Sequence, residues 1–200
     1  MPPLVFLPGA AGRGAFWQPV AARLKDLGPA HLFSFPGFGT APSDPGIRSM
    51  DDLFSWFLDR LPPGASHVIA QSMGGVLATR LALEMPERVA RMVLVATSGG
   101  LDMRRLGASE WRREFRRERP DVPSWFVDDQ TDLSGRLSAI RAPTLLLWSD
   151  ADPISPLSVA NLLAARMARA RIATIAGGSH VFARERPDEV ASLIRQFLHS

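Results

Sequence analysis

The apolar residues of the chain occur in two kinds of segment that alternate along it. Short runs rich in β-branched and aromatic residues predict six strands. These cover residues 4–7, 32–35, 67–70, 92–96, 144–148 and 171–175. Segments with a helical apolar period separate or follow them, at residues 16–27, 50–61, 76–85, 156–168 and 187–198. Such alternation is typical of βαβ units, so we expect an α/β fold with a mostly parallel, doubly wound sheet.

One long segment interrupts this alternation. No strand is expected between residues 99 and 142. Residues 108–119 predict a strongly charged helix, and residues 120–130 carry two prolines beside the adjacent pair Trp125 and Phe126. The chain has no internal repeat and no low-complexity linker. We therefore expect a single domain over residues 1–200, with residues 99–142 as a small insertion.

Composition excludes several classes of protein. With 200 residues, 46% hydrophobic and 22% charged, the chain fits a globular domain rather than a disordered or fibrous one. It has no cysteine, which removes disulfides, thiolate metal sites and a cysteine nucleophile. A net charge of +3 is too small to indicate nucleic-acid binding. No apolar run reaches the roughly 18–20 residues that span a membrane, and the start of the chain lacks a basic leader, so we expect a cytoplasmic protein.

Ser72 stands where a predicted strand turns into a predicted helix. The residues two before and two after it, Ala70 and Gly74, are small. An abrupt turn of this kind strains the backbone of its central residue, and bulk at either flanking position would collide across the turn. It exposes a serine hydroxyl at the positive end of a helix, where backbone N–H groups can stabilise an oxyanion. The pattern alone also fits a plain helix N-cap, for which serine is favoured.

A glycine-containing loop, residues 9–12, directly follows the first predicted strand. Glycine lets a backbone approach a ligand closely, although a tight strand-to-helix turn needs glycine as well. In an oxyanion hole, one N–H comes from the residue after the nucleophile, here Met73, and another from the loop after a neighbouring strand. The backbone N–H of Ala10 is the expected second donor.

An acidic side chain follows the fifth predicted strand. Asp152 lies just past the strand end and precedes Pro153, which disfavours helical backbone angles and stiffens the loop. In open α/β sheets the carboxyl ends of the strands carry the site. Asp150, in the same loop, and Asp102, after the fourth strand, are alternatives for the same role.

A histidine follows the sixth predicted strand. His180 comes after two glycines, residues 177–178, and before the last helix. Ser72, Asp152 and His180 thus each follow a strand, in the chain order Ser, Asp, His. This order and context predict a catalytic triad in which His180 takes the proton of Ser72 and Asp152 orients the imidazole. Such a mechanism requires no metal and no cofactor.

With these motifs the chain resembles the α/β-hydrolase fold superfamily over nearly its whole length. Residues 35–39, Phe-Pro-Gly-Phe-Gly, are similar to a strand-end loop of the family, and residues 85–89 and 185–190 to its usual helix exit and last helix start. The resemblance implies the strand order 2-1-3-4-5-6 in this chain's own numbering. Pro8-Gly9 stands where the family commonly has His-Gly, and the family's first two strands have no counterpart. The strand at residues 32–35 is therefore an edge that can pair with a second copy, and the oligomeric state stays open.

The resemblance also implies that residues 99–142 form a short lid over the active site. Its aromatic residues suit a small, largely apolar acyl substrate, although they can equally bury the lid against the body. The expected substrate-binding residues are Trp111, Phe115, Trp125 and Phe126.

Between residues 104 and 119 the lid also carries seven arginines: Arg104, Arg105, Arg112, Arg113, Arg116, Arg117 and Arg119. Mixed charges at four-residue spacing are typical of a solvated helix. The chain also resembles the pimeloyl-carrier-protein methyl ester esterases, which use lid arginines to hold an acidic acyl carrier protein. An acidic carrier protein is therefore a possible partner.

The motifs predict an enzyme that hydrolyses a small carboxylic ester or thioester. The same triad supports carrier-protein methyl ester esterases, lyases, carbon–carbon hydrolases, lactonases and perhydrolases, because a fold does not decide among reactions. A non-catalytic receptor with the same fold is a further alternative. No glycine fingerprint followed by an acidic ribose-binding residue occurs, which argues against a nucleotide-dependent oxidoreductase.

Overall fold

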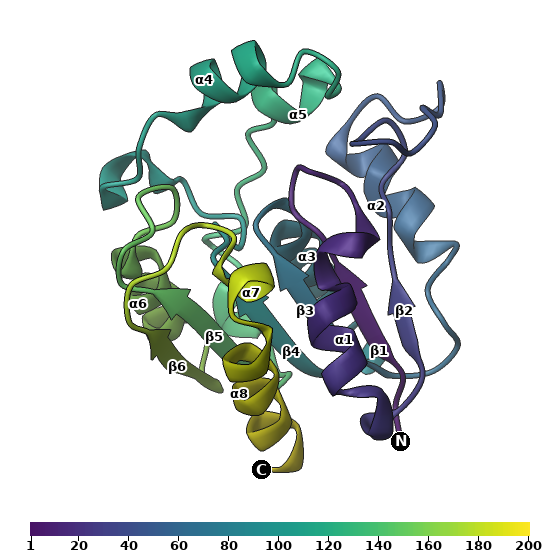
Figure 1. The fold of residues 1–200 in the computed structure, drawn as a ribbon, viewed down its shortest axis with the longest axis vertical. Coiled ribbons are helices and arrows are strands. Elements are labelled where there is room, and N and C mark those ends of the chain that lie inside the picture. The colour runs from purple at the N-terminus through teal and green to yellow at the C-terminus, as the bar shows by residue number, and fades with distance from the viewer.

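A computed structural model describes residues 1–200, except for the side chain of Arg105. Its centre is one six-stranded sheet in the order β2-β1-β3-β4-β5-β6, in which every described strand pair is parallel (Figure 1). The predicted fold class and strand order are confirmed. The strands are β1 (Leu4–Leu7), β2 (Ala30–Leu32), β3 (Ser66–Gln71), β4 (Val89–Val95), β5 (Thr144–Ser149) and β6 (Ala170–Ile175).

The second strand lies earlier in the chain than its apolar run predicts. The run covers residues 32–35, whereas β2 ends at Leu32. Beyond it the chain follows the loop after β1, since the Phe35 N–H donates to the Gly12 carbonyl. The Phe33 N–H still donates to the Phe6 carbonyl of β1, so hydrogen bonding to the sheet continues one residue past β2. Phe35 is buried beyond that point, so its hydrophobicity reflects packing rather than pairing in the sheet. The predicted range for this strand was therefore largely wrong.

Helices cover both faces of the sheet. One face carries α1 (Gln18–Arg23), the short α7 (Phe182–Glu185) and α8 (Pro187–His199). The other carries α2 (Met50–Leu58), α3 (Met73–Glu84) and α6 (Leu157–Arg166). Side chains along each strand alternate between the two faces. In β1, Leu4 and Phe6 pack in the core beneath α1 and α8, and Val5 and Leu7 pack in the core beneath α2, α3 and α6. The central strands β1, β3, β4 and β5 are consequently buried on both sides along most of their length, which explains their continuous apolar runs, whereas the edge strands β2 and β6 are more exposed.

The 99–142 segment crosses the carboxyl end of the sheet, at the top of Figure 1. It contains α4 (Trp111–Glu118) and α5 (Ser124–Asp128). Polar contacts tie its first part to the body: the Ser109 N–H donates to the Pro153 carbonyl, and the Ser158 hydroxyl to the Leu106 carbonyl. In its middle, the ring of Phe38 packs edge-on against those of α5. Across the described residues, no helix is long and apolar enough to cross a membrane.

Candidate active site

Ser72 occupies the sharp turn between β3 and α3. Its φ of 50° and ψ of −120° lie in a region that non-glycine residues rarely adopt. The backbone is held there because the Ser72 N–H donates to the Val95 carbonyl at 3.0 Å. Its carbonyl accepts from the Thr97 hydroxyl at 2.5 Å and from the Gly75 N–H at 2.9 Å. The Ser72 side chain makes no capping hydrogen bond to α3, so it does not serve as a helix N-cap.

The small residues after Ser72 allow two close contacts. A Cβ on Gly74 would lie 2.6 Å from the Pro8 carbonyl oxygen, at the end of β1. A Cβ on Gly75 would lie 2.4 Å from the Thr97 Oγ1. The glycine that the sequence pattern requires two residues after the serine therefore lets the turn pack against the neighbouring strand.

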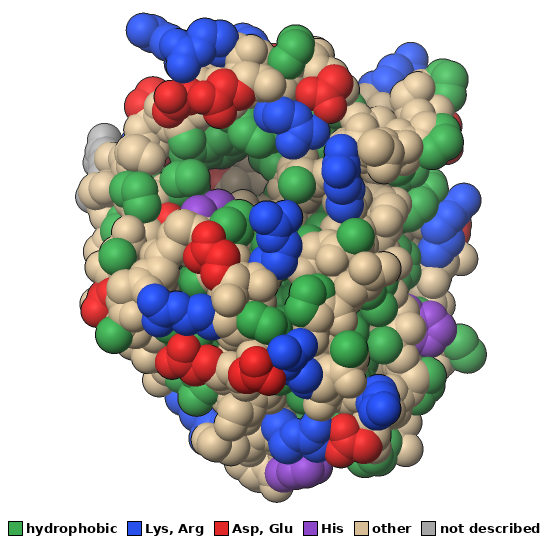
Figure 2. Space-filling model, viewed as in Figure 1, with side chains coloured by type: hydrophobic (Ala, Val, Ile, Leu, Met, Phe, Trp, Pro, Cys, Tyr) green, Lys and Arg blue, Asp and Glu red, His purple; other side chains and the backbone are tan. Residues whose placement is uncertain are grey.

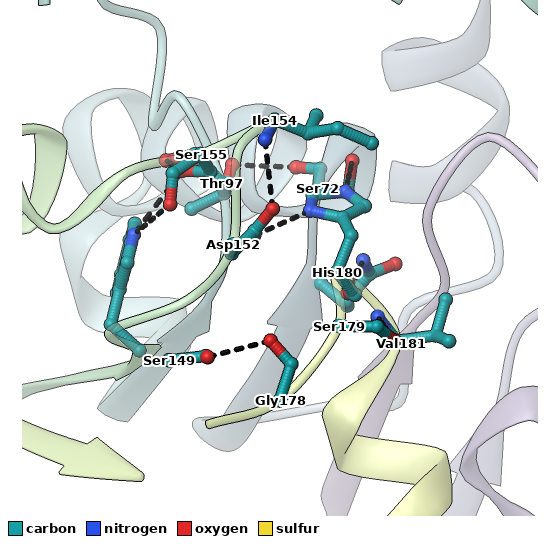
Figure 3. Close-up of polar contacts among 12 residues, drawn as sticks. Ser72, Thr97, Ser149, Asp152, Ile154, Ser155, Gly178, Ser179, His180 and Val181 are labelled. Carbon is teal, nitrogen blue, oxygen red and sulfur yellow. Dashed lines mark hydrogen bonds and ion pairs between the residues drawn. The ribbon is translucent and has the colours of Figure 1, made fainter. Parts of the chain in front are cut away.

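His180 lies between Ser72 and Asp152 (Figure 3). Its Nε2 is 3.1 Å from the Ser72 Oγ, and its Nδ1 is 2.7 Å from the Asp152 Oδ2. The second Asp152 oxygen accepts the Ile154 N–H at 2.9 Å. The Asp152 side chain is 0% exposed and that of His180 18%. A buried carboxylate beside Nδ1 favours the tautomer with its proton there, which leaves Nε2 free to accept the serine proton.

The two alternative acids point elsewhere. Asp150 accepts the Gly177 N–H at 2.6 Å, at the base of the loop that carries His180. Asp102 accepts the Arg104 N–H and forms an ion pair with the Arg104 side chain at 2.7 Å. Of the three acids considered from the sequence, the structure brings Asp152 to the histidine.

Two backbone N–H groups border the space above Ser72. That of Met73 is the first of α3, so it has no partner within the helix. That of Ala10 donates to no acceptor among the described residues. Both residues line the same cavity as the Ser72 side chain. A Cβ on the neighbouring Gly9 would lie 2.2 Å from the Gln71 Oε1, so a larger residue at this position would have to displace the Gln71 side chain.

The loop that carries His180 is held by residues that the sequence did not single out. The Ser149 hydroxyl donates to the Gly178 carbonyl at 2.7 Å, as Figure 3 shows. The Gln71 amide donates to the His180 carbonyl at 3.2 Å. Ser149 and Gln71 are the last residues of β5 and β3, and both are buried. A buried polar residue at the end of a strand was the available signal, because it must find a hydrogen-bond partner.

A cavity of about 910 Å³ opens above Ser72 and His180, under the 99–142 segment. Figure 2 shows this hollow with hydrophobic side chains around it and acidic ones along its upper rim. Among the predicted substrate-binding residues, Trp111, Phe115 and Phe126 line the cavity. Trp125 does not line the cavity, and its ring packs against Phe38 with a centroid distance of 5.7 Å.

The roof of the cavity is more polar than the aromatic residues suggest. Seven carboxylates line it together with three arginines: Asp102, Glu110, Glu114, Glu118, Asp128, Asp129 and Asp132, with Arg104, Arg112 and Arg119. The backbone N–H and hydroxyl of Ser134 lower the pKa of Asp132, which keeps that carboxylate charged. The floor of the cavity, around Ser72, is more apolar, since Met73 and Val76 in the first turn of α3 and Ala96 directly after β4 also line it. An apolar acyl group therefore fits the floor better than the roof.

Comparison with known proteins identifies the family. The model of the alpha/beta hydrolase fold family matches residues 2–129, and a second alpha/beta hydrolase family model matches residues 102–193. The chain belongs to the alpha/beta hydrolase fold family. The resemblance noted from its motifs is thereby confirmed.

Several known esterases are similar to this hydrolase in sequence or in fold. It is 28% identical to a pimeloyl-[acyl-carrier protein] methyl ester esterase of Nitrosomonas europaea, over 86% of this chain and 85% of the relative. An esterase of the same name from Aeromonas salmonicida is 35% identical, over 48% of this chain and 38% of the relative. A thermophilic esterase from Thermogutta terrifontis superposes with a TM-score of 0.80 and 21% identity, covering 100% of this chain and 90% of that one, which shows the fold alone.

Proposed function

We propose that this hydrolase cleaves a carboxylic ester or thioester of a small acyl group through Ser72, His180 and Asp152. The observation that carries the proposal is the continuous contact from the Ser72 Oγ through the imidazole to the buried Asp152 carboxylate. The esterase names of its relatives support the same reaction class. Asp152 stabilises the imidazolium that forms during the reaction and holds the ring in the required tautomer.

In the first half of the reaction, the Ser72 Oγ bonds to the acyl carbonyl carbon while its proton passes to the His180 Nε2. The carbonyl oxygen becomes an oxyanion, which accepts hydrogen bonds from the Met73 and Ala10 N–H groups. The bond from carbon to the alcohol oxygen, or thiol sulfur, then breaks. His180 returns its proton to that leaving atom, and the acyl group remains on Ser72.

In the second half, water replaces the alcohol. His180 takes a proton from the water as its oxygen bonds to the acyl carbon, and an oxyanion forms again in the same place. The bond to the Ser72 Oγ then breaks, and His180 gives the proton back to the serine. The products are the free acid and the regenerated enzyme. The 99–142 segment acts as a lid that encloses the reacting groups.

A panel of p-nitrophenyl esters of increasing acyl length tests this function. We expect release of p-nitrophenol and labelling of Ser72 by a fluorophosphonate probe, because the probe reacts with an activated serine. A non-catalytic receptor predicts neither. Labelling without turnover of any ester would favour a lyase or a carbon–carbon hydrolase over an esterase.

Hydrolysis of an ester whose acyl group is attached to a carrier protein is a second candidate function. The charge distribution on α4 favours it. Glu110, at its N-cap, and Glu114 and Glu118 line the cavity, whereas Arg113, Arg116 and Arg117 do not. In Figure 2, basic side chains lie along the outer edge of the molecule, above the acidic ones at the rim of the hollow. Such an outward basic face suits an acidic protein whose acyl arm enters the cavity.

Charge reversal of Arg113, Arg116 and Arg117 to glutamate tests this docking. We expect the KM for a carrier-protein methyl ester to rise about 10-fold, since electrostatic steering changes association rates by that order or more. The KM for a short p-nitrophenyl ester should stay nearly constant, because a neutral molecule is not steered. Raising the salt concentration should reproduce the effect in the wild type on the carrier-protein ester alone.

The matched control reverses three exposed arginines at the opposite end of the sheet, Arg141, Arg169 and Arg171. It changes the net charge by the same amount but leaves α4 intact. Kinetics on both substrates separate the two variants. An equal response of the two substrates to the α4 reversal would contradict docking of a carrier protein there and leave a small-molecule esterase.

A further inference from the structure

Thr97 touches the nucleophile turn from the side away from the cavity. It follows β4 by two residues, and 1% of it is exposed. Its hydroxyl donates to the Ser72 carbonyl at 2.5 Å and accepts the Gly99 N–H at 3.0 Å. Thr97 is absent from the lining of the cavity, so it does not reach a bound substrate.

The hydrogen bond from Thr97 orients the whole peptide group between Ser72 and Met73. The Ser72 carbonyl and the Met73 N–H belong to one peptide group, which is planar, and its C=O and N–H point in opposite directions. A hydroxyl that holds the carbonyl on the side of β4 therefore turns the Met73 N–H toward the opposite side, where Met73 borders the cavity. The orientation of this peptide plane decides whether that N–H can donate to an oxyanion above Ser72.

Thr97 is itself held on the other side. The Ser155 hydroxyl donates to the Thr97 carbonyl at 3.2 Å, and the indole N–H of Trp148 donates to the Ser155 carbonyl at 2.9 Å. Figure 3 shows Thr97 between Ser155 and Ser72. Ser155 lies in the loop that supplies Asp152, and Gly75 leaves the space that Thr97 Oγ1 occupies. The loop of the acid and the turn of the nucleophile are thus joined through one threonine.

We infer that Thr97 is a positioning residue that orients the Met73 N–H as an oxyanion donor, which rests on the proposed serine hydrolase function. The Gly75 N–H also donates to the Ser72 carbonyl, so loss of the Thr97 hydroxyl tilts the peptide rather than releasing it. Removal of a whole oxyanion donor costs about 100- to 1000-fold in kcat elsewhere. We expect the tilt to cost roughly 10- to 100-fold.

The test replaces Thr97 with valine, which keeps the shape and removes the hydroxyl. Thr144→Val is the matched control. The fully buried Thr144 also donates to a main-chain carbonyl, that of Ala142, but it is the first residue of β5 and so lies at the end of the sheet away from Ser72. Thr97→Ser keeps the hydroxyl. We expect Thr97→Val to lower kcat for a p-nitrophenyl ester while KM changes little, and Thr97→Ser to restore most of the rate.

A trifluoromethyl ketone separates positioning from general damage. The serine oxygen adds to its carbonyl carbon, and the resulting alkoxide occupies the place of the oxyanion. For Thr97→Val, the inhibition constant should rise by about the same factor as kcat/KM falls, because both report the oxyanion interaction. The midpoint of the pH–rate profile should not move, since Thr97 does not contact His180. Thr144→Val should leave all three readouts unchanged and lower only the melting temperature.

Equal kcat values and equal inhibition constants for Thr97→Val and Thr144→Val would overturn the inference. A loss of rate without a matching loss of inhibitor affinity would overturn it as well. Thr97→Ala removes the same hydroxyl and leaves a smaller side chain. If the valine variant does not fold, the same rates and inhibition constants are measured on the alanine variant. Wild-type protein that neither hydrolyses esters nor reacts with a fluorophosphonate would contradict the proposed function itself, and the inference with it.

Discussion

Ser72→Ala is expected to lower kcat for ester hydrolysis by about a million-fold, with the fold retained. Removal of the serine or histidine of a triad costs that order elsewhere, because the remaining two residues have no nucleophile to activate. The strained φ of 50° is not relieved by alanine, so the folded state keeps the same backbone cost. Initial rates with p-nitrophenyl butyrate, fluorophosphonate labelling and a melting curve together provide the measurement.

The strand that precedes Ser72 offers a control for this prediction. Ser66, at the other end of β3, is fully buried, and its hydroxyl has no hydrogen-bond partner among the described residues. Ser66→Ala should leave activity unchanged and stability unchanged or slightly higher, because an unpaired buried hydroxyl contributes nothing favourable. A folded Ser72→Ala protein with turnover near that of Ser66→Ala would contradict the role of Ser72 as the nucleophile.

The position of the candidate triad could be predicted because a parallel sheet brings all strand ends of one direction to one edge. Ser72, Asp152 and His180 each follow a strand, and sequence order alone placed them at the same edge. Small residues around Ser72 fixed the local turn as well, since Gly74 has no space for a side chain. These features are local, and local features can be recognised in a single sequence.

The 99–142 segment was harder to predict because its side chains are oriented by distant contacts. Nothing near Trp125 in the sequence indicates that its ring stays out of the cavity lining while that of the adjacent Phe126 takes part in it. The helical period of Glu110, Glu114 and Glu118 predicts one acidic face but not which face turns inward. The hydrogen bonds of Gln71 and Thr97 were not predicted either, since a bond between two segments far apart in the chain leaves no spacing pattern.

Asp152→Asn is expected to lower kcat on the order of 10,000-fold, as the equivalent substitution does in other triads. The reason is the tautomer. The Asp152 Oδ1 already accepts the Ile154 N–H at 2.9 Å, so the amide oxygen of asparagine takes that place and its NH₂ faces the imidazole Nδ1. The ring then carries its proton on Nε2 and cannot accept one from Ser72. Structure and KM should change little.

Asp150→Asn is the matched comparison, since the two acids stand two residues apart in one loop. Asp150 accepts the Gly177 N–H, and an asparagine carbonyl can accept the same bond, so kcat should stay within several-fold of the wild type. Rates for both variants, each checked for folding by circular dichroism, decide the assignment. If Asp150→Asn lost far more activity than Asp152→Asn, the acid of the mechanism would be Asp150, and the loop would have to rearrange on substrate binding to bring it to His180.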